Sequence, residues 1–199
     1  MSVPTPEVAE QLLGWAERLN PGPWVSHVRT AARAARTIAA ACGMDPDRAY
    51  VLGLLHDIGR YQGVTSLQHV VAGYQLMMEK GYTKVALICQ THTFPVPTLE
   101  GYHGAIDCTP EEAAQLEAAL HSAVYDDEVL LIQLCDAICL PDRVTFVEQR
   151  LVEVALRHGV TPQIPEKWRA FLNLKTHFDG LCGRNIYTLF PEDMRKLLE

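Results

Sequence analysis

A histidine and an aspartate stand side by side in the segment LLHDIGR, at the end of an otherwise apolar stretch. Ala49, Leu52 and His56 fall on one stripe of the expected helix, so the His56-Asp57 pair should face the interior. An ionised carboxylate loses favourable hydration when it is buried, unless a partner compensates for that loss. Imidazole and carboxylate are both good ligands for a divalent metal ion. The pair therefore predicts a metal site, and its remaining ligands must come from elsewhere in the chain.

A second carboxylate stands in an even more apolar setting. Asp136 lies within VLLIQLCDAICL, and the burial of its unpaired charge would cost several kcal/mol. Its partner must be a cation, either a metal ion or an arginine such as Arg143, seven residues further on. His27, near the start of an alanine-rich helical stretch, shares the face of that helix that points inward. At this point both partners of Asp136 remain open.

Two further histidines lie between these positions. His69 is found in SLQHVVAGYQLM, and His92 follows in ICQTHTF, one expected helix later. Taken singly, either residue could be an ordinary core or surface histidine. Together with His56 and Asp57, they are candidates for a second group of metal ligands.

The elements that carry these residues are predicted to be helical. Apolar residues repeat with helical period nearly throughout, and regularly spaced short strands are absent. We expect an all-α fold, a single globular bundle in which an apolar helix over residues 128–140 lies buried at the centre. The segment 94–107 contains prolines and glycines and is expected to be a long loop. Helices are expected over residues 7–19, 24–42, 46–57, 66–80, 83–94, 109–125, 128–140, 143–158 and 165–174, and after Pro191.

The composition narrows the classes of function. The chain has 199 residues, of which 48% are hydrophobic and 21% charged, and this fits one globular domain over residues 1–199. A net charge of −7 and a pI near 5.6 argue against binding to a nucleic-acid backbone. Phosphorylated small molecules remain possible ligands, because local cations or metal ions can outweigh a mildly negative total charge.

The N-terminus and the cysteines bear on the location of the protein. The first residues lack the basic start and apolar core of a signal peptide, and the longest apolar run, 129–140, is too short to cross a bilayer. We therefore expect no membrane partner. The six cysteines are scattered without a CxxC pair, which predicts reduced, mostly buried thiols in a cytoplasmic protein.

The order His27, His56-Asp57, Asp136 resembles the HD superfamily of metal-dependent phosphohydrolases, and LLHDIGR is very similar to the signature segment of that superfamily. The resemblance spans about residues 24–140. It implies an HD-type helical domain with this core, on which the helices of residues 141–199 pack. It also implies that these four residues hold a divalent ion, and that a water activated by this ion attacks phosphorus.

In the binuclear branches of the superfamily, two histidines between the HD pair and the last aspartate bind a second metal. The resemblance thus implies His69 and His92 as ligands, with Asp57 as the bridge between two ions. Thr93 after His92 is similar to the His-Thr of bacterial HD-type symmetrical dinucleoside tetraphosphate hydrolases. The cyclic-di-GMP phosphodiesterase branch differs, since it has a His-His pair where this chain has Thr91-His92. That branch also has a Gly-Tyr-Pro motif, which is absent here. We expect one or two ions of Fe, Mn, Co, Ni or Zn.

Three residues are candidates for contacts with a substrate. Arg60 stands where the superfamily often has lysine and could hold a phosphate oxygen, although an exposed arginine at a helix C-terminus is the plain alternative. His103, in the expected loop (Gly101-Tyr102-His103), could be an extra ligand or a substrate contact. Arg143 approximates an arginine that follows the last aspartate in dinucleotide-cleaving relatives.

The leading hypothesis is an enzyme that hydrolyses a phosphoester or phosphoanhydride bond of a nucleotide or related metabolite, with Asp57 and Arg60 as catalytic residues. The alternative is a metal- and nucleotide-binding regulatory module without turnover. A purely structural role for Asp136 as a partner of Arg143 also remains open. So does a di-iron oxygenase, which is known within the superfamily and uses the same ligand types. The sequence does not predict the oligomeric state.

Overall fold

The structure is a computed structural model that describes residues 1–100, 102 and 104–197. Over these residues the chain forms ten α-helices and two 3₁₀ helices, and the only strand-like pairing is a single antiparallel bridge between Cys139 and Val144. The predicted all-α fold is confirmed. No helix in this part of the chain combines the length and the apolar character needed to span a membrane.

The first three helices bring the HD pair beside His27. They are α1 (Pro6–Leu19), α2 (Pro23–Ala41) and α3 (Pro46–Leu55), and each starts with a proline, which cannot donate a backbone hydrogen bond but is tolerated in a first turn. Helices α2 and α3 pack closely, because Gly53 has no side chain: a Cβ there would lie 2.8 Å from the Cα of Ala32. This close approach places the end of α3 against the N-terminal half of α2.

After the close approach at Gly53, a second close backbone contact follows the HD pair at Gly59. The 3₁₀ helix η1 (Ile58–Gln62) leads to α4 (Gln68–Glu79) and α5 (Thr83–Thr91). A Cβ at Gly59 would lie 1.9 Å from the carbonyl oxygen of His69, so only glycine fits there. The turn after Asp57 therefore touches the first turn of α4 directly, and this contact brings His69 to the HD pair.

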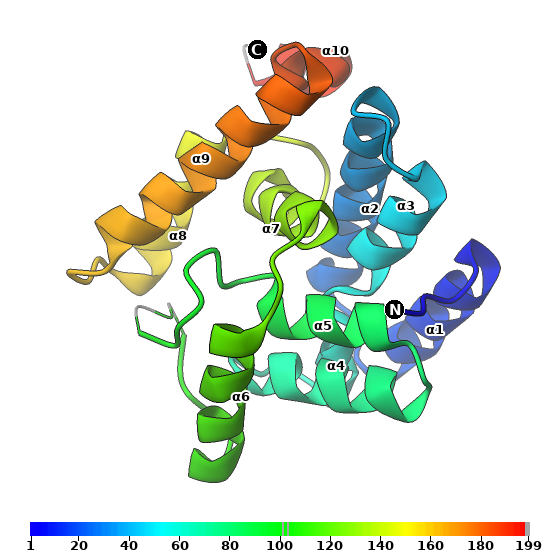
Figure 1. Ribbon diagram of the computed structural model, residues 1–199, viewed down its shortest axis with the longest axis vertical. Helices are drawn as coiled ribbons and strands as arrows, with labels where there is room; N and C mark the ends of the chain where they lie inside the picture. Colours follow the sequence, from blue (N-terminus) through cyan, green and yellow to red (C-terminus); the bar gives the residue numbers. More distant parts are fainter. Residues whose placement is uncertain (101, 103, 198–199) are drawn as a thin grey trace.

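Helix α7 (Asp127–Ile138) is the centre of the bundle, as predicted for residues 128–140. It follows α6 (Pro110–Ser122), which begins with a capping box between Thr109 and Glu112. Figure 1 shows α7 between α2 and α3 on one side and α8 (Val147–His158) and α9 (Ile164–Cys182) on the other. Its buried residues include Leu131, Ile132 and Leu134.

The C-terminal helices differ in their bounds from the prediction. Helix α8 starts at Val147 rather than at residue 143, because the preceding residues turn back on themselves: the backbone of Leu140 donates to the carbonyl of Arg143. Helix α9 continues to Cys182, well beyond the expected end at Leu174. It is followed by η2 (Ile186–Leu189) and α10 (Pro191–Lys196).

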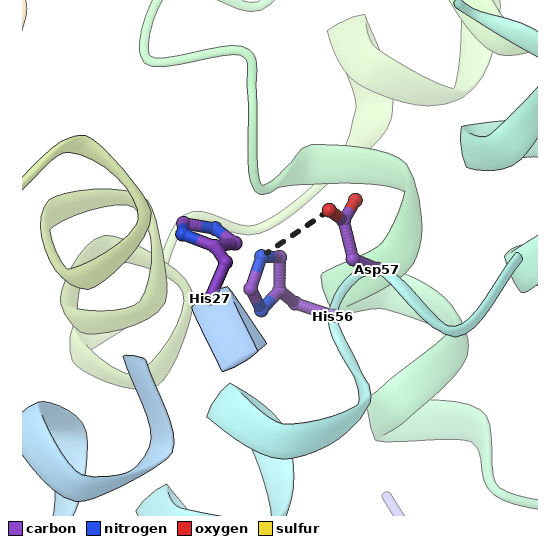
Figure 2. A group of neighbouring side chains, drawn as sticks. All are labelled: His27, His56 and Asp57. Carbon is purple, nitrogen blue, oxygen red and sulfur yellow. Dashed lines mark ion pairs between the residues drawn. The ribbon is translucent and has the colours of Figure 1, made fainter. Parts of the chain in front are cut away.

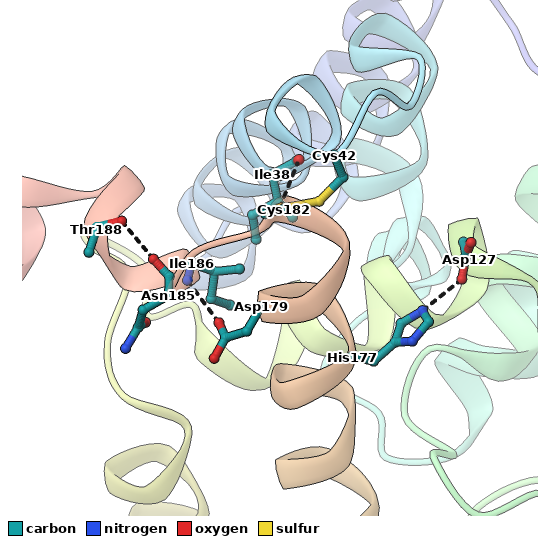
Figure 3. Close-up of a disulfide and its surroundings, with 9 residues drawn as sticks. All are labelled: Ile38, Cys42, Asp127, His177, Asp179, Cys182, Asn185, Ile186 and Thr188. Atoms are coloured by element: carbon teal, nitrogen blue, oxygen red, sulfur yellow. Dashed lines mark hydrogen bonds and ion pairs between the residues drawn. A yellow bond between two sulfur atoms is a disulfide. The ribbon is translucent and has the colours of Figure 1, made fainter.

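The extension of α9 creates a cross-link that the sequence did not suggest. Figure 3 shows the disulfide between Cys42, directly after α2, and Cys182, the last residue of α9. The prediction that all cysteines are reduced is wrong for this pair, since the two residues lie 140 positions apart and meet only when α9 is complete. Cys89, Cys135 and Cys139 are buried thiols, as expected.

Candidate metal centre

The HD pair occupies the point where α3 gives way to η1. His56 follows the last residue of α3 and Asp57 precedes η1, so the change of helix type turns both side chains toward one space. Figure 2 shows their side chains facing the imidazole of His27 from α2. The side chains of His56 and Asp57 are 0% and 5% exposed. The predicted burial of the pair is therefore observed.

Three histidines of the centre are oriented by the same type of backbone hydrogen bond. In His56, His69 and His92, the ring Nδ1 lies within hydrogen-bond distance of the backbone carbonyl oxygen three residues earlier. These carbonyl groups belong to Gly53, Ser66 and Cys89. A neutral imidazole that donates from Nδ1 has its lone pair on Nε2, and this is the usual arrangement of a metal-binding histidine. All three Nε2 atoms point to the centre.

The carboxylate of Asp57 lies between two groups of histidines. Its Oδ1 is 3.0 Å from the Nε2 of His69 and 3.4 Å from that of His92. Its Oδ2 faces the other side, 4.0 Å from the Nε2 of His56. Each oxygen of one carboxylate thus meets a different set of imidazoles, as a bridging ligand between two cations would.

Asp136 completes the group on the His56 side. Its Oδ1 lies 2.9 Å from the Nε2 of His27 and 3.7 Å from that of His56. Arg143 pairs instead with its neighbour Asp142, with Nη1 2.7 Å from Oδ2. The alternative in which Arg143 is the structural partner of Asp136 is therefore wrong.

All six predicted metal ligands are brought together. They fall into three overlapping groups whose potential ligand atoms lie within 4.8 Å of one another. The groups are His27, His56 and Asp57; His56, His92 and Asp136; and Asp57, His69 and His92.

The charges of the centre suit cation binding. Burial raises the pKa of Asp57, but the adjacent Arg60 guanidinium and His69 outweigh it and hold that pKa well below its usual range. Burial likewise opposes ionisation of Asp136, yet its contacts with His27 and His56 lower its pKa well below the ordinary value. Burial lowers the pKa of His69 and favours its neutral form. Two carboxylates are therefore charged beside a neutral imidazole.

Several buried polar atoms of the centre have no hydrogen bond within the described chain. They are the Nε2 atoms of His56 and His69 and the Oδ1 of Asp57. Since neutral His69 carries its proton on Nδ1, its Nε2 and the Asp57 Oδ1 are two acceptors that face each other. A buried polar atom without a partner is costly, and a cation between these atoms would satisfy both. Nitrogen and carboxylate donors of this kind fit divalent transition metals.

The predicted substrate contacts have different positions. Arg60 lines the cleft at the centre, and its Nε donates to Asp57 Oδ2 at 2.5 Å, so it is not a simple exposed arginine. Arg143 is not among the residues that line this cleft. His103 and Gly101 lie outside the described residues.

The cleft has a volume of about 880 Å³ and a second wall that the sequence analysis missed. This wall comes from α8 and α9 and includes Arg150, Arg157, His158, Lys167 and Phe171. One signal was present in the sequence: Arg150 and Arg157 are seven residues apart and share a helix face. Nothing in the local pattern indicated that this face would turn toward the histidines.

A family model described as HD domain matches residues 24–139. The match covers more than half of the chain, and the chain belongs to the HD domain family. Comparisons with curated proteins and with solved structures gave no match. Members of this family are generally metal-dependent phosphohydrolases, and the clusters of histidine and aspartate described above could hold a divalent ion.

Proposed function

We propose that the protein is a metal-dependent phosphohydrolase that cleaves a phosphoester or phosphoanhydride bond of a small phosphorylated compound, such as a nucleotide. The observation that carries the proposal is the position of Asp57. Its two oxygens face two separate groups of imidazoles, and its Oδ1 and the Nε2 of His69 are buried without a hydrogen bond to any described residue. A divalent cation between these atoms would satisfy both of them.

The ligands divide into two sets in this proposal. One ion would be held by His27, His56, Asp57 and Asp136, and a second by His69, His92 and the shared Asp57. Divalent ions bound there supply an activated water as nucleophile and neutralise charge on the phosphoryl oxygens. The four ligands of the first ion would leave further coordination positions open for water and substrate.

Arg60 is the chain's own cation at the reacting group. Its Nε is committed to Asp57 Oδ2, which orients the guanidinium along the cleft wall. The terminal nitrogens would then bind a phosphoryl oxygen in the geometry that arginine favours. The backbone carbonyl of Arg60 accepts a hydrogen bond of 2.7 Å from Asn20 Nδ2, which holds η1 against the end of α1.

We also propose that residues 1–199 act as one domain. Helices α8 and α9 pack on α7, and α9 also contacts α2, so the residues beyond the family match complete the cleft. The substrate would thus bind between the family core and the C-terminal helices.

The test combines metal analysis with a matched pair of variants. The purified protein is analysed for metal content and then assayed with phosphomonoesters and nucleotides in the presence of Mn, Fe, Co, Ni or Zn. Asp57→Asn should lose metal and lower kcat/KM by at least about 1,000-fold, since it removes ligand charge from both ions. The control is Asp142→Asn, because Asp142 is an exposed carboxylate that pairs only with Arg143 among the described residues.

Two results would contradict the proposal. Tight binding of a nucleotide that stays intact with every metal would support the regulatory module instead. A bound iron pair that consumes dioxygen without releasing phosphate would support the oxygenase.

A further inference from the structure

The wall of the cleft that faces the metal centre is built outside the family match. The match ends at residue 139, whereas this wall comes from α8 and α9. Figure 1 shows the two helices side by side, on the far side of α7 from α3. The features of this wall are therefore not given by the family match.

The wall carries an excess of positive charge. Arg150, Arg157 and Lys167 line the cleft there, and the one carboxylate among them is Glu153. Glu153 lies 2.7 Å from the Nη1 of Arg150 and 3.6 Å from the Nε of Arg157, so a single negative charge is shared by two guanidinium groups. The chain as a whole has a net charge of −7, so the positive charge of this wall is opposite in sign to the net charge of the protein.

Lys167 is the residue of this wall that makes no direct ion pair with another described residue. Among the described residues, its ammonium makes neither a hydrogen bond nor an ion pair, although the side chain is half-buried. Burial lowers the pKa of its ammonium to about 8 against the opposing effect of the Asp136 charge, so most of the population is still charged at neutral pH. A partly buried charge without a partner is unfavourable, and an anionic ligand would remove that cost.

The place of Lys167 connects this wall to the centre. It lines the cleft together with Thr93, which directly follows His92, and with Tyr102. The same three residues also line a small adjoining cavity of about 40 Å³ under the segment after α5. Helix α9 thus brings the ammonium of Lys167 to the segment that follows His92.

The size of the cleft leaves room for a ligand larger than one phosphoryl group. Its volume of about 880 Å³ falls within the usual range of roughly 300–1,000 Å³ for small-molecule sites. A ligand that fills the cleft and places one phosphoryl group at Asp57 would reach the wall of α8 and α9. Leu151, Val154 and Phe171 would contact its less polar part.

We propose that Lys167, Arg150 and Arg157 form a second anion-binding subsite, which holds a phosphate of the substrate other than the one that is cleaved. This inference rests on the proposed phosphohydrolase function and specifies its substrate class. The preferred substrates are compounds with at least two phosphates, such as nucleoside polyphosphates, and simple monoesters are poor ones. The three residues position the substrate and take no part in bond cleavage.

The first experiment measures the subsite without turnover. Inorganic tripolyphosphate is titrated into metal-stripped, dialysed protein, and its affinity is determined by calorimetry. We expect Lys167→Met to weaken binding by about tenfold or more, as the loss of a charge-assisted contact implies. The matched control is Lys175→Met on the same helix, whose ammonium already pairs with Asp179, and it should bind like wild type. Equal losses in the two variants would overturn the proposal.

The second experiment uses the metal-loaded enzyme with two substrates. Lys167→Met should raise KM for adenosine triphosphate about tenfold and leave KM for p-nitrophenyl phosphate unchanged, while Lys167→Arg restores the first value. If Lys167→Met does not fold, Arg157→Met serves in its place with the same expectation. Equal changes for the two substrates would contradict the subsite.

The two proposals fail in different ways. If no compound is hydrolysed with any metal but tripolyphosphate binding depends on Lys167, the hydrolase is wrong and the subsite stands. If p-nitrophenyl phosphate is hydrolysed but tripolyphosphate binds equally to wild type and Lys167→Met, the subsite is wrong and the hydrolase stands.

Discussion

The Nε2 of His69 and the Oδ1 of Asp57 lie 3.0 Å apart in the buried centre, and neither atom has a hydrogen bond in the part of the chain that the structure describes. The backbone carbonyl of Ser66 takes the proton of His69 on the opposite ring nitrogen, so two acceptors face each other. Such a contact is unfavourable by itself and becomes favourable when a cation lies between the atoms. The relationship links the HD pair, at the end of α3, to α4.

The first prediction concerns the number of metal ions. His69→Ala should reduce the bound metal from two ions to one per chain, because His27, His56, Asp57 and Asp136 remain to hold the other. Activity should fall by at least about 100-fold, since loss of even an outer-shell partner of a metal ligand typically costs 10–100-fold. Metal content is measured by mass spectrometry after dialysis.

The control for this variant is His121→Ala, because His121 is exposed on α6 and its contacts are limited to Glu117 among the described residues. It should keep both metal content and activity. A wild-type protein that binds a single ion, unchanged in His69→Ala, would contradict the assignment of the second set of ligands.

The second prediction tests the backbone contact behind that pair. Gly59→Ala would place a methyl group 1.9 Å from the carbonyl oxygen of His69, so α4 must move away from the turn after Asp57. Overpacking of this kind destabilises proteins by about 1–3 kcal/mol or more. We expect that loss in urea unfolding, together with weaker metal binding.

Gly180→Ala is the matched control, since a Cβ at Gly180 in α9 would meet no atom of the described residues within 4 Å. Alanine is favoured over glycine inside a helix by about 0.5–1 kcal/mol, so this variant should be slightly more stable than wild type. Equal stability of the two variants would show that the close approach at Gly59 is unimportant.

The sequence was informative where a polar residue lies in an apolar helix. His56, Asp57 and Asp136 each stand out locally, because burial of such groups needs a partner regardless of the remaining fold. The starts of α3 and α6 depend on equally local features, since the side chains of Asp45 and Thr109 cap these helices and a proline follows each of them. These signals depend on neighbours within one or two helical turns.

Contacts between segments far apart in the sequence could not be predicted from local patterns. Lys167 and Arg157 look like solvent-exposed residues of amphipathic helices, and only the packing of α8 and α9 turns them toward the cleft. Cys42 and Cys182 lack any spacing motif, and their pairing follows from the length of α9. The cytoplasmic location stays a prediction, although disulfides are rare in that compartment.

The third prediction concerns the disulfide. It joins α2, which carries His27, to the helix that carries Lys167, and it closes a loop with a sequence separation of 140 residues. Replacement of Cys42 and Cys182 by serine should reduce the free energy of unfolding by about 2–4 kcal/mol, mainly because the unfolded chain gains freedom. Urea unfolding without reductant measures this difference.

Cys108→Ser is the control, because Cys108 is an unpaired, half-buried thiol. It should unfold like wild type under the same conditions. Addition of dithiothreitol should bring wild type close to the double variant; if reductant and substitution both leave the midpoint unchanged, the cross-link does not form in solution.

The fourth prediction is a pH dependence of stability that originates at Lys167. Burial lowers the pKa of Lys167 from the ordinary 10.5 to about 8 in the folded protein, and it outweighs the charge of Asp136, which raises this pKa. Between these two values the unfolded chain binds more protons at this position than the folded chain does, so the contribution of Lys167 to stability rises with pH. Below about pH 8 the lysine is charged in both states, and the folded protein bears the full cost of the partly buried charge.

Lys167→Met should therefore stabilise the metal-free protein at pH 7, and this advantage should shrink as the pH rises toward 10.5. Urea unfolding of both proteins across this range measures the difference, in which the titration of groups common to both cancels. A difference that stays constant with pH would show that the ammonium is as well solvated in the fold as in the unfolded chain, and it would remove the reason for this wall to attract an anion.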